Sequence, residues 1–231
     1  MATVLITGAN RGLGLEFARQ YAEAGWEVLA CCRDPARASA LNALTERWPA
    51  VSVRRLDLDH FEQIDALARD LADCPIDILL NNAGIYGHSE RSRLGALDYD
   101  LWAQVFKINV LAPVKLAEAF LPQVQRSARK LIVALTSLMG SIADNTSGGA
   151  LPYRSSKAAL NAAMKSLAID LAGRGIGVLL LHPGWVKTDM GGPNAPTSPE
   201  ESVAGMRRVI DAYTPKDSGR FLDFRGQERP W

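Results

Sequence analysis

Apolar residues gather in short uninterrupted runs along the chain, and these runs alternate with segments of helical periodicity. A continuous apolar run of about four to eight residues is typical of a strand that is covered on both faces. The runs predicted as strands are residues 3–7, 27–32, 51–56, 76–81, 130–136, 177–181 and 221–224. The alternation of strands and helices predicts crossover connections, which build a parallel sheet.

Helical periodicity marks the segments between the runs. Leu13, Phe17 and Tyr21 lie four positions apart, and Gly25 after them is a typical helix stop. The further helices are predicted at residues 35–47, 61–72, 98–121, 153–172 and 199–213. We therefore predict one doubly wound α/β domain, with about seven parallel strands and helices on both faces of the sheet.

Composition agrees with a globular protein and argues against several classes. The chain has 231 residues, of which 48% are hydrophobic and 22% charged, and its net charge is +1. This balance favours neither nucleic acid nor an anionic membrane as a partner. The first residues, MATVLITG, lack a secretory signal pattern, and no apolar run reaches the roughly 18 residues of a membrane span, so we expect a cytoplasmic protein. The cysteines and histidines show neither a disulfide framework nor metal-ligand spacing, so no metal is expected.

A glycine-rich stretch, TGANRGLG, connects the first predicted strand to the first predicted helix. Gly8, Gly12 and Gly14 permit tight backbone turns and the close approach of a ligand. The helix behind them offers unpaired amide groups and the positive end of its dipole, which favour a pyrophosphate. The spacing differs from the Gly-x-Gly-x-x-Gly of the most familiar dinucleotide fold, so a plain structural turn is the alternative.

Tyr153 and Lys157 are four positions apart near the start of a predicted helix, so they share one face of it. A phenol has a pKa of about 10, and proton transfer near neutral pH requires a decrease of roughly 3 units, or about 4 kcal/mol. A unit charge about 4 Å away contributes about 4 kcal/mol at an effective dielectric constant of about 20. Lys157 is therefore expected to lower the pKa of Tyr153; the alternative is an unrelated surface pair.

Four motifs occur in the order and at the intervals typical of one family: TGANRGLG, NNAG at residues 81–84, Tyr153-x3-Lys157, and HPG at residues 182–184. Over almost its whole length the chain thus resembles the short-chain dehydrogenase/reductase family. The stretches CRDP, MGSIADNTSGG, HPGWVKTDMGG and SGRFLDF are most similar to its C-factor and sniffer-type carbonyl reductases. The resemblance implies a Rossmann-type NAD(P)-binding domain over residues 1–231, with a substrate loop around residues 189–199.

The resemblance implies four catalytic residues, which are Ser137, Tyr153, Lys157 and Asn109. Ser137 follows a predicted strand and would stabilise negative charge on a substrate oxygen. A second argument supports Asn109, because Pro113 cannot donate a hydrogen bond to its carbonyl and would kink the helix there. The family uses the matching Asn to hold a water that relays protons to the Lys. A strand-end turn at Ser137 and a simple bend at Pro113 are the structural alternatives.

The choice of dinucleotide depends on the end of the second predicted strand. Sites selective for NAD carry an acid there, which holds the ribose 2′-hydroxyl. Cys32 stands at this position, Arg33 follows it, and Arg11 lies in the glycine-rich stretch. Two guanidinium groups suit a 2′-phosphate, so we expect NADP(H). The alternative is that Asp34 holds the ribose.

Further cofactor contacts are implied by the resemblance alone. Asp57 resembles the family's adenine-contacting Asp, although it could instead cap the helix at residues 61–72, for which Asp59 is the better candidate. A structural role is the alternative for residues 81–84. The implied cofactor-binding residues are Gly8, Asn10, Arg11, Gly12, Leu13, Gly14, Arg33, Asp57, Leu58, Asn82, Ala83, Gly84, Tyr153, Lys157, Pro183, Gly184, Val186 and Thr188.

We therefore expect an oxidoreductase that uses NADPH to reduce a ketone or aldehyde, with Tyr153 as general acid. The alternative is a signalling or regulatory protein of C-factor type that binds the dinucleotide with weak or no turnover. An epimerase with a large C-terminal substrate domain is disfavoured, because few residues follow Gly184.

The substrate pocket is expected to favour an apolar carbonyl or alcohol. Its expected lining is Leu138, Met139, Ile142, Tyr86, Trp185 and the loop at residues 191–199. Because family members commonly pair through two long helices, the resemblance also implies a homodimer or homotetramer through residues 98–121 and 153–172.

Overall fold

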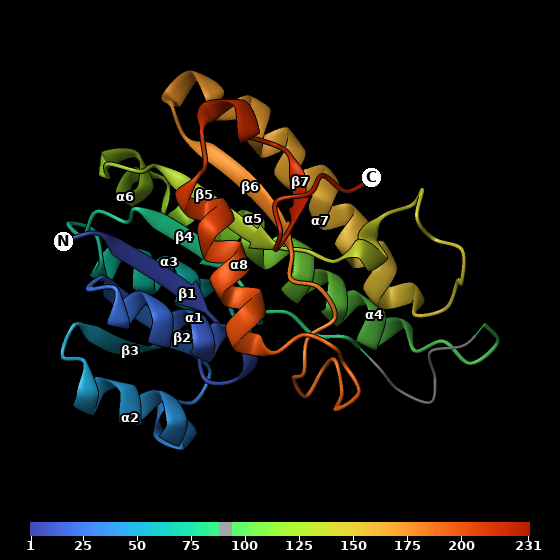
Figure 1. Ribbon diagram of the computed structural model, residues 1–231, viewed down its shortest axis with the longest axis horizontal. Helices are drawn as coiled ribbons and strands as arrows, with labels where there is room; N and C mark the ends of the chain where they lie inside the picture. The colour runs from blue at the N-terminus through green and yellow to red at the C-terminus, as the bar shows by residue number, and fades with distance from the viewer. Residues whose placement is uncertain (88–93) are drawn as a thin grey trace.

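The computed structural model describes residues 1–87 and 94–231 of the chain (Figure 1). In this part of the chain seven strands form one parallel sheet, in the order β3-β2-β1-β4-β5-β6-β7. The strands are β1 (Thr3–Thr7), β2 (Glu27–Cys32), β3 (Val51–Arg55), β4 (Ile78–Asn81), β5 (Leu131–Leu135), β6 (Gly177–His182) and β7 (Phe221–Asp223). Every apolar run predicted as a strand therefore forms one, and the predicted doubly wound α/β fold is confirmed.

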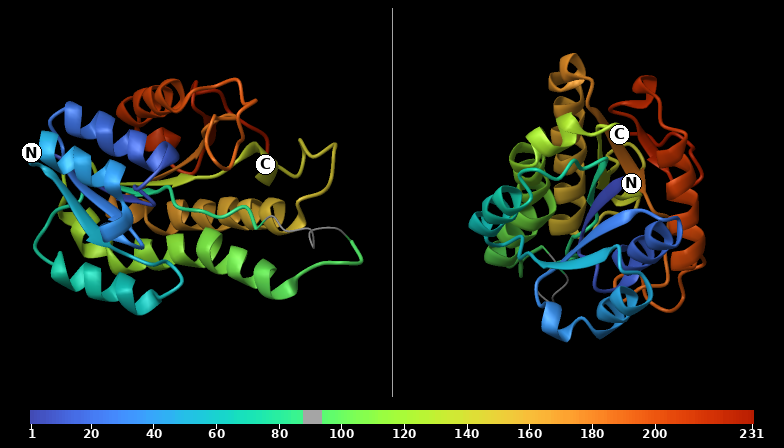
Figure 2. Two further views of the ribbon diagram at one scale, coloured as in Figure 1. Left: turned by 90° about the horizontal axis from the view of Figure 1, so that it is seen from below. Right: turned by 90° about the vertical axis from the view of Figure 1, so that its left-hand side faces the viewer.

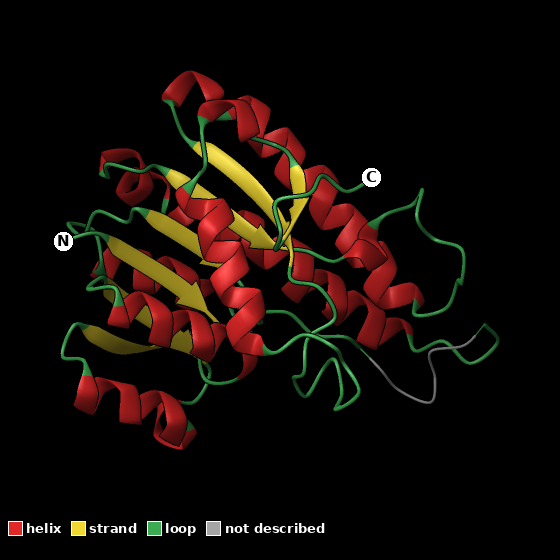
Figure 3. Ribbon diagram, viewed as in Figure 1, coloured by secondary structure: helices red, strands yellow, loops and turns green. Residues whose placement is uncertain are grey.

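Helices cover both faces of this sheet, as Figures 2 and 3 show. The α-helices are α1 (Gly12–Glu23), α2 (Ser39–Arg47), α3 (Phe61–Asp70), α4 (Tyr99–Phe106), α5 (Ala112–Ala119), α6 (Leu121–Arg126), α7 (Leu151–Asp170) and α8 (Pro199–Asp211). Shorter helical turns are η1 (Pro35–Arg37), η2 (Lys107–Leu111), η3 (Leu138–Gly140), η4 (Ala172–Arg174) and η5 (Pro215–Asp217). None of the helices described here is long and apolar enough to cross a membrane.

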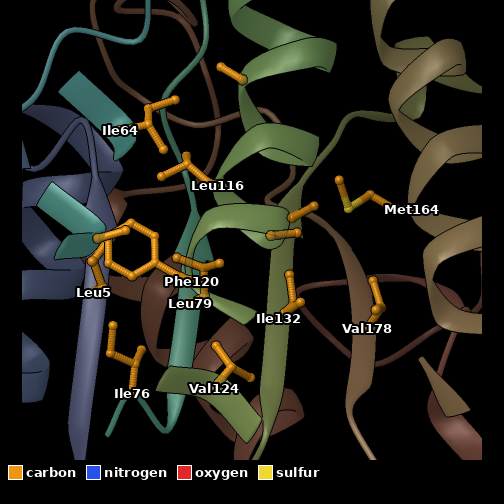
Figure 4. Close-up of a cluster of buried hydrophobic side chains, with 14 of the residues drawn as sticks. Leu5, Ile64, Ile76, Leu79, Leu116, Phe120, Val124, Ile132, Met164 and Val178 are labelled. Atoms are coloured by element: carbon orange, nitrogen blue, oxygen red, sulfur yellow. The ribbon is translucent and has the colours of Figure 1, made fainter. Parts of the chain in front are cut away.

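Two clusters of buried apolar side chains join the sheet to its two helical layers. Figure 4 shows the cluster that packs under α3, α5 and α7, where Leu5, Leu79 and Ile132 project from neighbouring strands. Leu80, the next residue along β4, belongs to the opposite cluster under α1, α2 and α8. Because successive strand residues enter opposite clusters, both faces of each strand must be apolar, which explains the uninterrupted runs in the sequence.

The fourth apolar run becomes a strand at Ile78, two residues later than predicted. The carboxylate of Asp77 accepts the N–H of Thr3 at 3.0 Å and the N–H groups of Ala128 and Arg129 at 3.1 Å. It thereby ties the starts of β1 and β4 to the turn before β5. A polar anchor at this position ends the strand, a role that an apolar pattern does not reveal.

The long helix predicted at residues 98–121 is divided by η2, a π-helical turn. Asp98 caps α4, since its side chain accepts the N–H of Leu101 at 2.9 Å. α4 then passes into η2, and η2 passes into α5, whose first turn contains Pro113. Pro113 has no N–H to donate, which favours the wider turn before it. The predicted irregularity at Asn109 is confirmed, because Asn109 lies inside η2.

The strand order changes direction between β1 and β4. These strands are neighbours in the sheet although β2 and β3 come between them in the sequence. In doubly wound sheets, ligands bind beside the carboxyl ends of the strands at such a switch point. The search for a functional site therefore begins at this edge.

Candidate active site

Four loops that carry the sequence motifs meet at the carboxyl edge of the sheet. They follow β1, β4, β5 and β6, which are consecutive neighbours in the sheet. Gly8, Ser137 and Pro183 each come one or two residues after the end of their strand. The start of α7 joins them, because a Cβ atom on Gly140 would lie 2.7 Å from the carbonyl carbon of Lys157. Five segments, the four loops and the start of α7, thus form one site.

The glycine loop after β1 is built as a cradle for an anion. Gly8 and Gly12 have φ values of +66° and +52°, which L side chains rarely adopt. A Cβ atom on Gly14 would lie 2.2 Å from the carbonyl oxygen of Gly8, so α1 can approach β1 this closely only with glycine there. Among the described residues no side chain caps α1, and its first turn holds no acid. Its amide N–H groups are therefore open to a phosphate.

Asn82 holds this loop from the neighbouring strand. Its Nδ2 donates to the carbonyl oxygens of Thr7 at 2.7 Å and Gly8 at 3.3 Å. In return, the N–H groups of Asn82 and Ala83 donate to Thr7 Oγ1 at 3.1 Å. The structural role that was the alternative for this segment is therefore present, and contact with a cofactor stays a prediction. Thr7, whose hydroxyl joins the glycine loop to the segment after β4, is a supporting residue that no sequence pattern marks.

Four residues expected to be catalytic come together behind these loops. Ser137, Tyr153, Lys157 and Asn109 are all buried. The hydroxyl of Ser137 interacts with that of Tyr153 and opposes the rise of the phenol's pKa. Lys157 lies one helical turn after Tyr153, with its Nζ 5.7 Å from the centre of the phenol ring. The side-chain geometry therefore agrees with a proton-transfer site and not with an unrelated surface pair.

Burial raises the pKa of Tyr153 and lowers that of Lys157, and in both residues it thereby favours the uncharged form. Burial raises the pKa of Tyr153 to about 12, with a smaller contribution in the same direction from the Tyr86 phenol and an opposing one from Ser137. Burial alone lowers the pKa of Lys157 to about 8. The expectation that Lys157 depresses the pKa of Tyr153 is therefore wrong for this structure. The lysine directs its ammonium group to the Leu135 carbonyl oxygen, 2.8 Å away, and the loss of hydration dominates at the phenol.

Asn109 is fully buried and uses its whole carboxamide within the protein. Its Oδ1 accepts the N–H of Ile85 at 2.8 Å, and its Nδ2 donates to the Ile85 carbonyl at 2.9 Å and to Ser156 Oγ at 3.0 Å. A Cβ atom on Gly84 would lie 3.2 Å from Asn109 Oδ1 and 3.6 Å from Lys157 Nζ. Asn109 thus joins the loop after β4 to α7 beside Lys157, and its part in a proton relay stays a prediction.

The residues expected to select NADP(H) lie at the ends of β1 and β2. Cys32 is the last residue of β2, and Arg33 after it is exposed. Arg11 is not free, because its Nη1 lies 2.6 Å from Asp189 Oδ2 in an exposed ion pair. Arg37, at the end of η1, is a third exposed guanidinium near the same strand end, and the sequence analysis did not single it out.

The segment after β6 packs against the glycine loop. A Cβ atom on Gly12 would lie 3.4 Å from Thr188 Cγ2. Val186 is buried and forms an isolated parallel bridge with Thr197, and the Pro183 carbonyl accepts the hydroxyl of Ser202 at 2.6 Å. The predicted substrate loop is thus fixed at both ends, and it brings Thr188 to the cradle as the resemblance implied.

The acids after β3 do not cap α3. His60 occupies the cap position, and no side-chain cap is found among the residues described. Asp57 instead accepts the N–H of Asp59 at 3.1 Å, and Asp59 pairs with Lys107 at 2.9 Å. The hydrogen bond from Lys107 lowers the pKa of Asp59. The capping alternative is therefore wrong for both acids. Adenine contact by Asp57 stays a prediction; the next residue, Leu58, has its side chain in the core.

His182 is a site residue whose role the sequence did not reveal. Its Nδ1 accepts the N–H of Leu138 at 3.2 Å, and Ser137 Oγ accepts the N–H of Met139 at 3.1 Å. Burial lowers the pKa of His182 to about 4, so the ring is neutral and its nitrogen can accept. The histidine thus fixes the turn that carries Ser137. Among the described residues, no group of three or more His, Cys, Asp or Glu side chains could hold a metal ion.

Contact of the expected lining residues with a substrate stays a prediction. Tyr86 packs against Tyr153 in a tilted arrangement, with the ring centres 4.6 Å apart. Ile142 and Trp185 expose much of their apolar surface, and the indole N–H of Trp185 donates to the Gly191 carbonyl at 2.7 Å. The wall loop after η3 is tied to the end of the chain, since the N–H of Ala143 donates to the Trp231 carbonyl at 2.9 Å.

The fold and the site together define a class of protein: a doubly wound α/β protein with a glycine-rich loop at a helix N-terminus, next to a buried serine, tyrosine and lysine. Comparison with known proteins agrees with this class. The family model described as short chain dehydrogenase matches residues 2–198. The chain belongs to the short-chain dehydrogenase family, as the resemblance in the sequence implied.

Individual relatives and solved structures show which members of the family this chain is similar to. C-signal of Myxococcus xanthus is 48% identical over 166 residues, which cover 72% of this chain and 99% of that protein. The solved structure of the carbonyl reductase Sniffer of D. melanogaster matches with a TM-score of 0.93 at 34% identity, over 100% of both chains. The NADPH-bound carbonyl reductase from chicken fatty liver matches with a TM-score of 0.92 at 35% identity, over 100% of this chain and 99% of the other. The expected likeness to sniffer-type carbonyl reductases is confirmed.

Proposed function

We propose that this chain is an NADPH-dependent reductase of ketones or aldehydes. The observation that carries the proposal is that Ser137, Tyr153 and Lys157 are buried together, with Lys157 Nζ 5.7 Å from the phenol ring centre and the glycine loop nearby. The hydroxyl groups of Ser137 and Tyr153 can hold one substrate oxygen between them. Structures of similar proteins that are carbonyl reductases support this reading.

The residues of this chain fit a nicotinamide dinucleotide with a 2′-phosphate. The glycine cradle and the open amides of α1 would hold the pyrophosphate. Arg33 and Arg11 would pair with the 2′-phosphate, provided that Arg11 exchanges Asp189 for it. When bound, NADPH supplies the hydride that adds to the carbonyl carbon.

Tyr153 donates the proton that completes the reduction. Because its pKa is raised to about 12, the phenol keeps its proton at neutral pH and is available as an acid. Its Oη–H bond breaks as the proton passes to the carbonyl oxygen, which becomes the alcohol hydroxyl. The hydroxyl of Ser137 donates a hydrogen bond to the same oxygen while negative charge develops on it. Lys157, one helical turn further along α7, would hold the ribose of the dinucleotide next to the phenol.

Asn109 and His182 keep these groups in place. Asn109 holds α7 through Ser156, next to Lys157, and we assign to it the relay that returns a proton to Tyr153 from solvent. His182 holds the turn that carries Ser137. Exposed apolar side chains at Ile142 and Trp185 favour an apolar substrate.

The test is consumption of NADPH by the wild-type chain and by Tyr153→Phe, against a panel of quinones, aromatic aldehydes, diketones and steroids. Loss of the acid is expected to lower turnover roughly 100- to 10,000-fold while NADPH binding is retained. Tyr99→Phe is the matched control, because Tyr99 is an exposed phenol that stacks on Trp102 in α4. Undiminished turnover by Tyr153→Phe would refute the assignment of Tyr153 as the general acid.

A second candidate function is supported by one observation, the 48% identity to C-signal over 99% of that protein. On this hypothesis the chain binds the dinucleotide and acts as a signalling or regulatory protein with little turnover. The panel separates the two candidates. NADPH binding that changes association with another protein, while every carbonyl compound fails as a substrate, would favour the signalling role.

A further inference from the structure

Tyr86 lies directly against the proposed acid. The ring centres of Tyr86 and Tyr153 are 4.6 Å apart and their planes are inclined by 34°. Aromatic rings attract each other in such tilted arrangements at this separation. Tyr153 is buried, whereas Tyr86 is only partly buried. Tyr86 is therefore an aromatic side chain that touches the acid and also keeps accessible surface.

The backbone on both sides of Tyr86 is fixed. The Asn109 carboxamide holds both the N–H and the carbonyl of Ile85, at 2.8 and 2.9 Å. Gly87 has a φ of +66°, and a Cβ atom there would lie 2.3 Å from Val105 Cγ2, so the chain packs tightly against α4. Two elements, α4 and η2, thus fix the backbone on both sides of Tyr86, and the packing against Tyr153 fixes its ring. A fixed aromatic ring can discriminate between ligands, since little of its own freedom is lost on binding.

The reacting carbonyl must lie close to this ring. Its oxygen has to reach the hydroxyls of both Tyr153 and Ser137, which are buried side by side in the proposed mechanism. With the Tyr86 ring centre 4.6 Å from that of Tyr153, one substituent of the carbonyl carbon lies within reach of the Tyr86 ring. A flat conjugated substituent can stack on such a ring, whereas a puckered saturated ring of similar size makes a poorer contact.

We propose that Tyr86 is a specificity-determining residue, which contacts the substrate through its ring and favours carbonyl compounds that carry an aromatic or conjugated group. This inference rests on the proposed reductase function and names the substrate class of the same site. The competing explanation is that Tyr86 only positions Tyr153, in which case it affects all substrates equally.

The test measures binding without turnover. Acetophenone and cyclohexyl methyl ketone differ in the flatness of one ring, and NADP⁺ has no hydride to give them. Isothermal titration of each ketone into the protein saturated with NADP⁺ yields a dissociation constant for wild type, Tyr86→Phe and Tyr86→Leu. Tyr99→Leu is the matched control, because Tyr99 is 71% exposed and its ring stacks on Trp102, not on Tyr153.

We expect wild type to bind acetophenone more tightly than cyclohexyl methyl ketone. Tyr86→Leu should weaken acetophenone binding roughly 3- to 10-fold and cyclohexyl methyl ketone binding less than about 2-fold. Tyr86→Phe, which keeps the ring and guards against a folding defect, should bind like wild type, as should Tyr99→Leu. The inference is overturned if Tyr86→Leu weakens both ketones equally, if it weakens neither, or if neither ketone binds to the wild-type complex.

A failure of the proposed function has a different signature. Selective, Tyr86-dependent binding of acetophenone without consumption of NADPH on any carbonyl compound would refute the reductase and keep the aromatic subsite. Conversely, the protein could consume NADPH with the same kcat/KM for benzaldehyde and cyclohexanecarbaldehyde. If Tyr86→Leu then leaves the ratio of these two kcat/KM values unchanged, the reductase function is kept and the aromatic subsite is refuted.

Discussion

Lys157 holds an ammonium group where water is almost excluded, with 4% of the residue exposed. Burial lowers its pKa from 10.5 to about 8, which means that the folded chain resists the charge that the chemistry requires. Between those two pH values the unfolded chain binds more protons at this site, so stability increases as pH rises through this range. Below about pH 8 the charged lysine destabilises the fold.

Replacement of Lys157 is therefore expected to stabilise the chain and abolish turnover. Each pKa unit corresponds to about 1.4 kcal/mol, and the lost hydrogen bond to the Leu135 carbonyl offsets about 1 kcal/mol of the gain. Chemical unfolding at pH 7 should show Lys157→Met more stable than wild type by roughly 1–3 kcal/mol. Lys165→Met, an exposed lysine two turns further along α7, is the control. A clear loss of stability in Lys157→Met would contradict the buried-charge account.

Arg33 is expected to decide between the two nicotinamide dinucleotides. A charge-assisted hydrogen bond to a phosphate contributes about 1.5–3 kcal/mol to binding. Because Arg33 is exposed to water, we expect its contribution to lie at the lower end of this range. Arg33→Ala should weaken NADPH binding roughly 10-fold and NADH binding less than about 3-fold. Fluorescence titration measures both constants, with Arg174→Ala in the exposed turn after α7 as control. Equal weakening of both dinucleotides would place the 2′-phosphate elsewhere.

The sequence was sufficient to predict the residues proposed to react, but not the residues that hold them in position. The spacing of Tyr153 and Lys157 is sufficient to place them on one helix face, whatever surrounds them. The support from His182 depends on β6 and η3 lying side by side, which one sequence does not encode locally. The pKa of Tyr153 could not be predicted for the same reason, because burial is a property of the assembled fold.

The glycine loop and α1 act as one element, since α1 begins inside the loop. Gly14 gives the sharpest test, because an added Cβ atom would lie 2.2 Å from the Gly8 carbonyl oxygen and 2.6 Å from Asn82 Nδ2. Neither group is the flexible end of a long side chain, so the loop must move. Gly14→Ala should weaken dinucleotide binding at least roughly 10-fold and destabilise the fold by about 1–3 kcal/mol.

Gly173→Ala is the matched control, because a Cβ atom there has no neighbour within 4 Å among the described residues. Its stability and its dinucleotide affinity should equal those of wild type. If Gly14→Ala also binds NADPH like wild type, the loop is not the phosphate cradle that its shape indicates.

The boundaries of helices could be predicted where the local sequence determines them. They could not be predicted where contacts with distant parts of the chain determine them. Pro113 removes a backbone donor whatever the fold, so the irregularity at Asn109 could be predicted. The helix predicted at residues 35–47 instead divides at Ala38, whose φ of −92° and ψ of 56° are not helical. Ala38 is buried against the sheet, and no sequence signal marks this break.

The whole molecule leaves apolar side chains exposed on the helices through which a partner copy is expected to pack. Leu111 in η2 is 51% exposed, and Ile169 in α7 is 67% exposed. We propose a homodimer or homotetramer on this face. Light scattering at micromolar concentration should show an oligomer for wild type and a smaller species for Leu111→Glu combined with Ile169→Glu. Leu94→Glu, an exposed residue outside these helices, should leave the mass unchanged; a monomeric wild type would remove the proposal.

The fold as a whole was predictable because its pattern is repeated along the chain. Buried parallel strands must be apolar on both faces, and their crossovers must be helical, so seven runs and their intervals indicate a doubly wound sheet. The connection between Arg11 and Asp189 was not predictable, because it joins the loop after β1 to the loop after β6 through side chains alone.

Hydride transfer to a carbonyl carbon is the central claim, and isotope transfer tests it most directly. The wild-type chain would be incubated with benzaldehyde and NADPH that carries deuterium at the transferred position, and the product analysed by mass spectrometry. The account predicts benzyl alcohol with one deuterium on the carbinol carbon, and no such product from Tyr153→Phe above roughly one hundredth of the wild-type rate. NADPH that binds but gives no deuterated alcohol, from benzaldehyde or from any carbonyl compound of the panel, would contradict it.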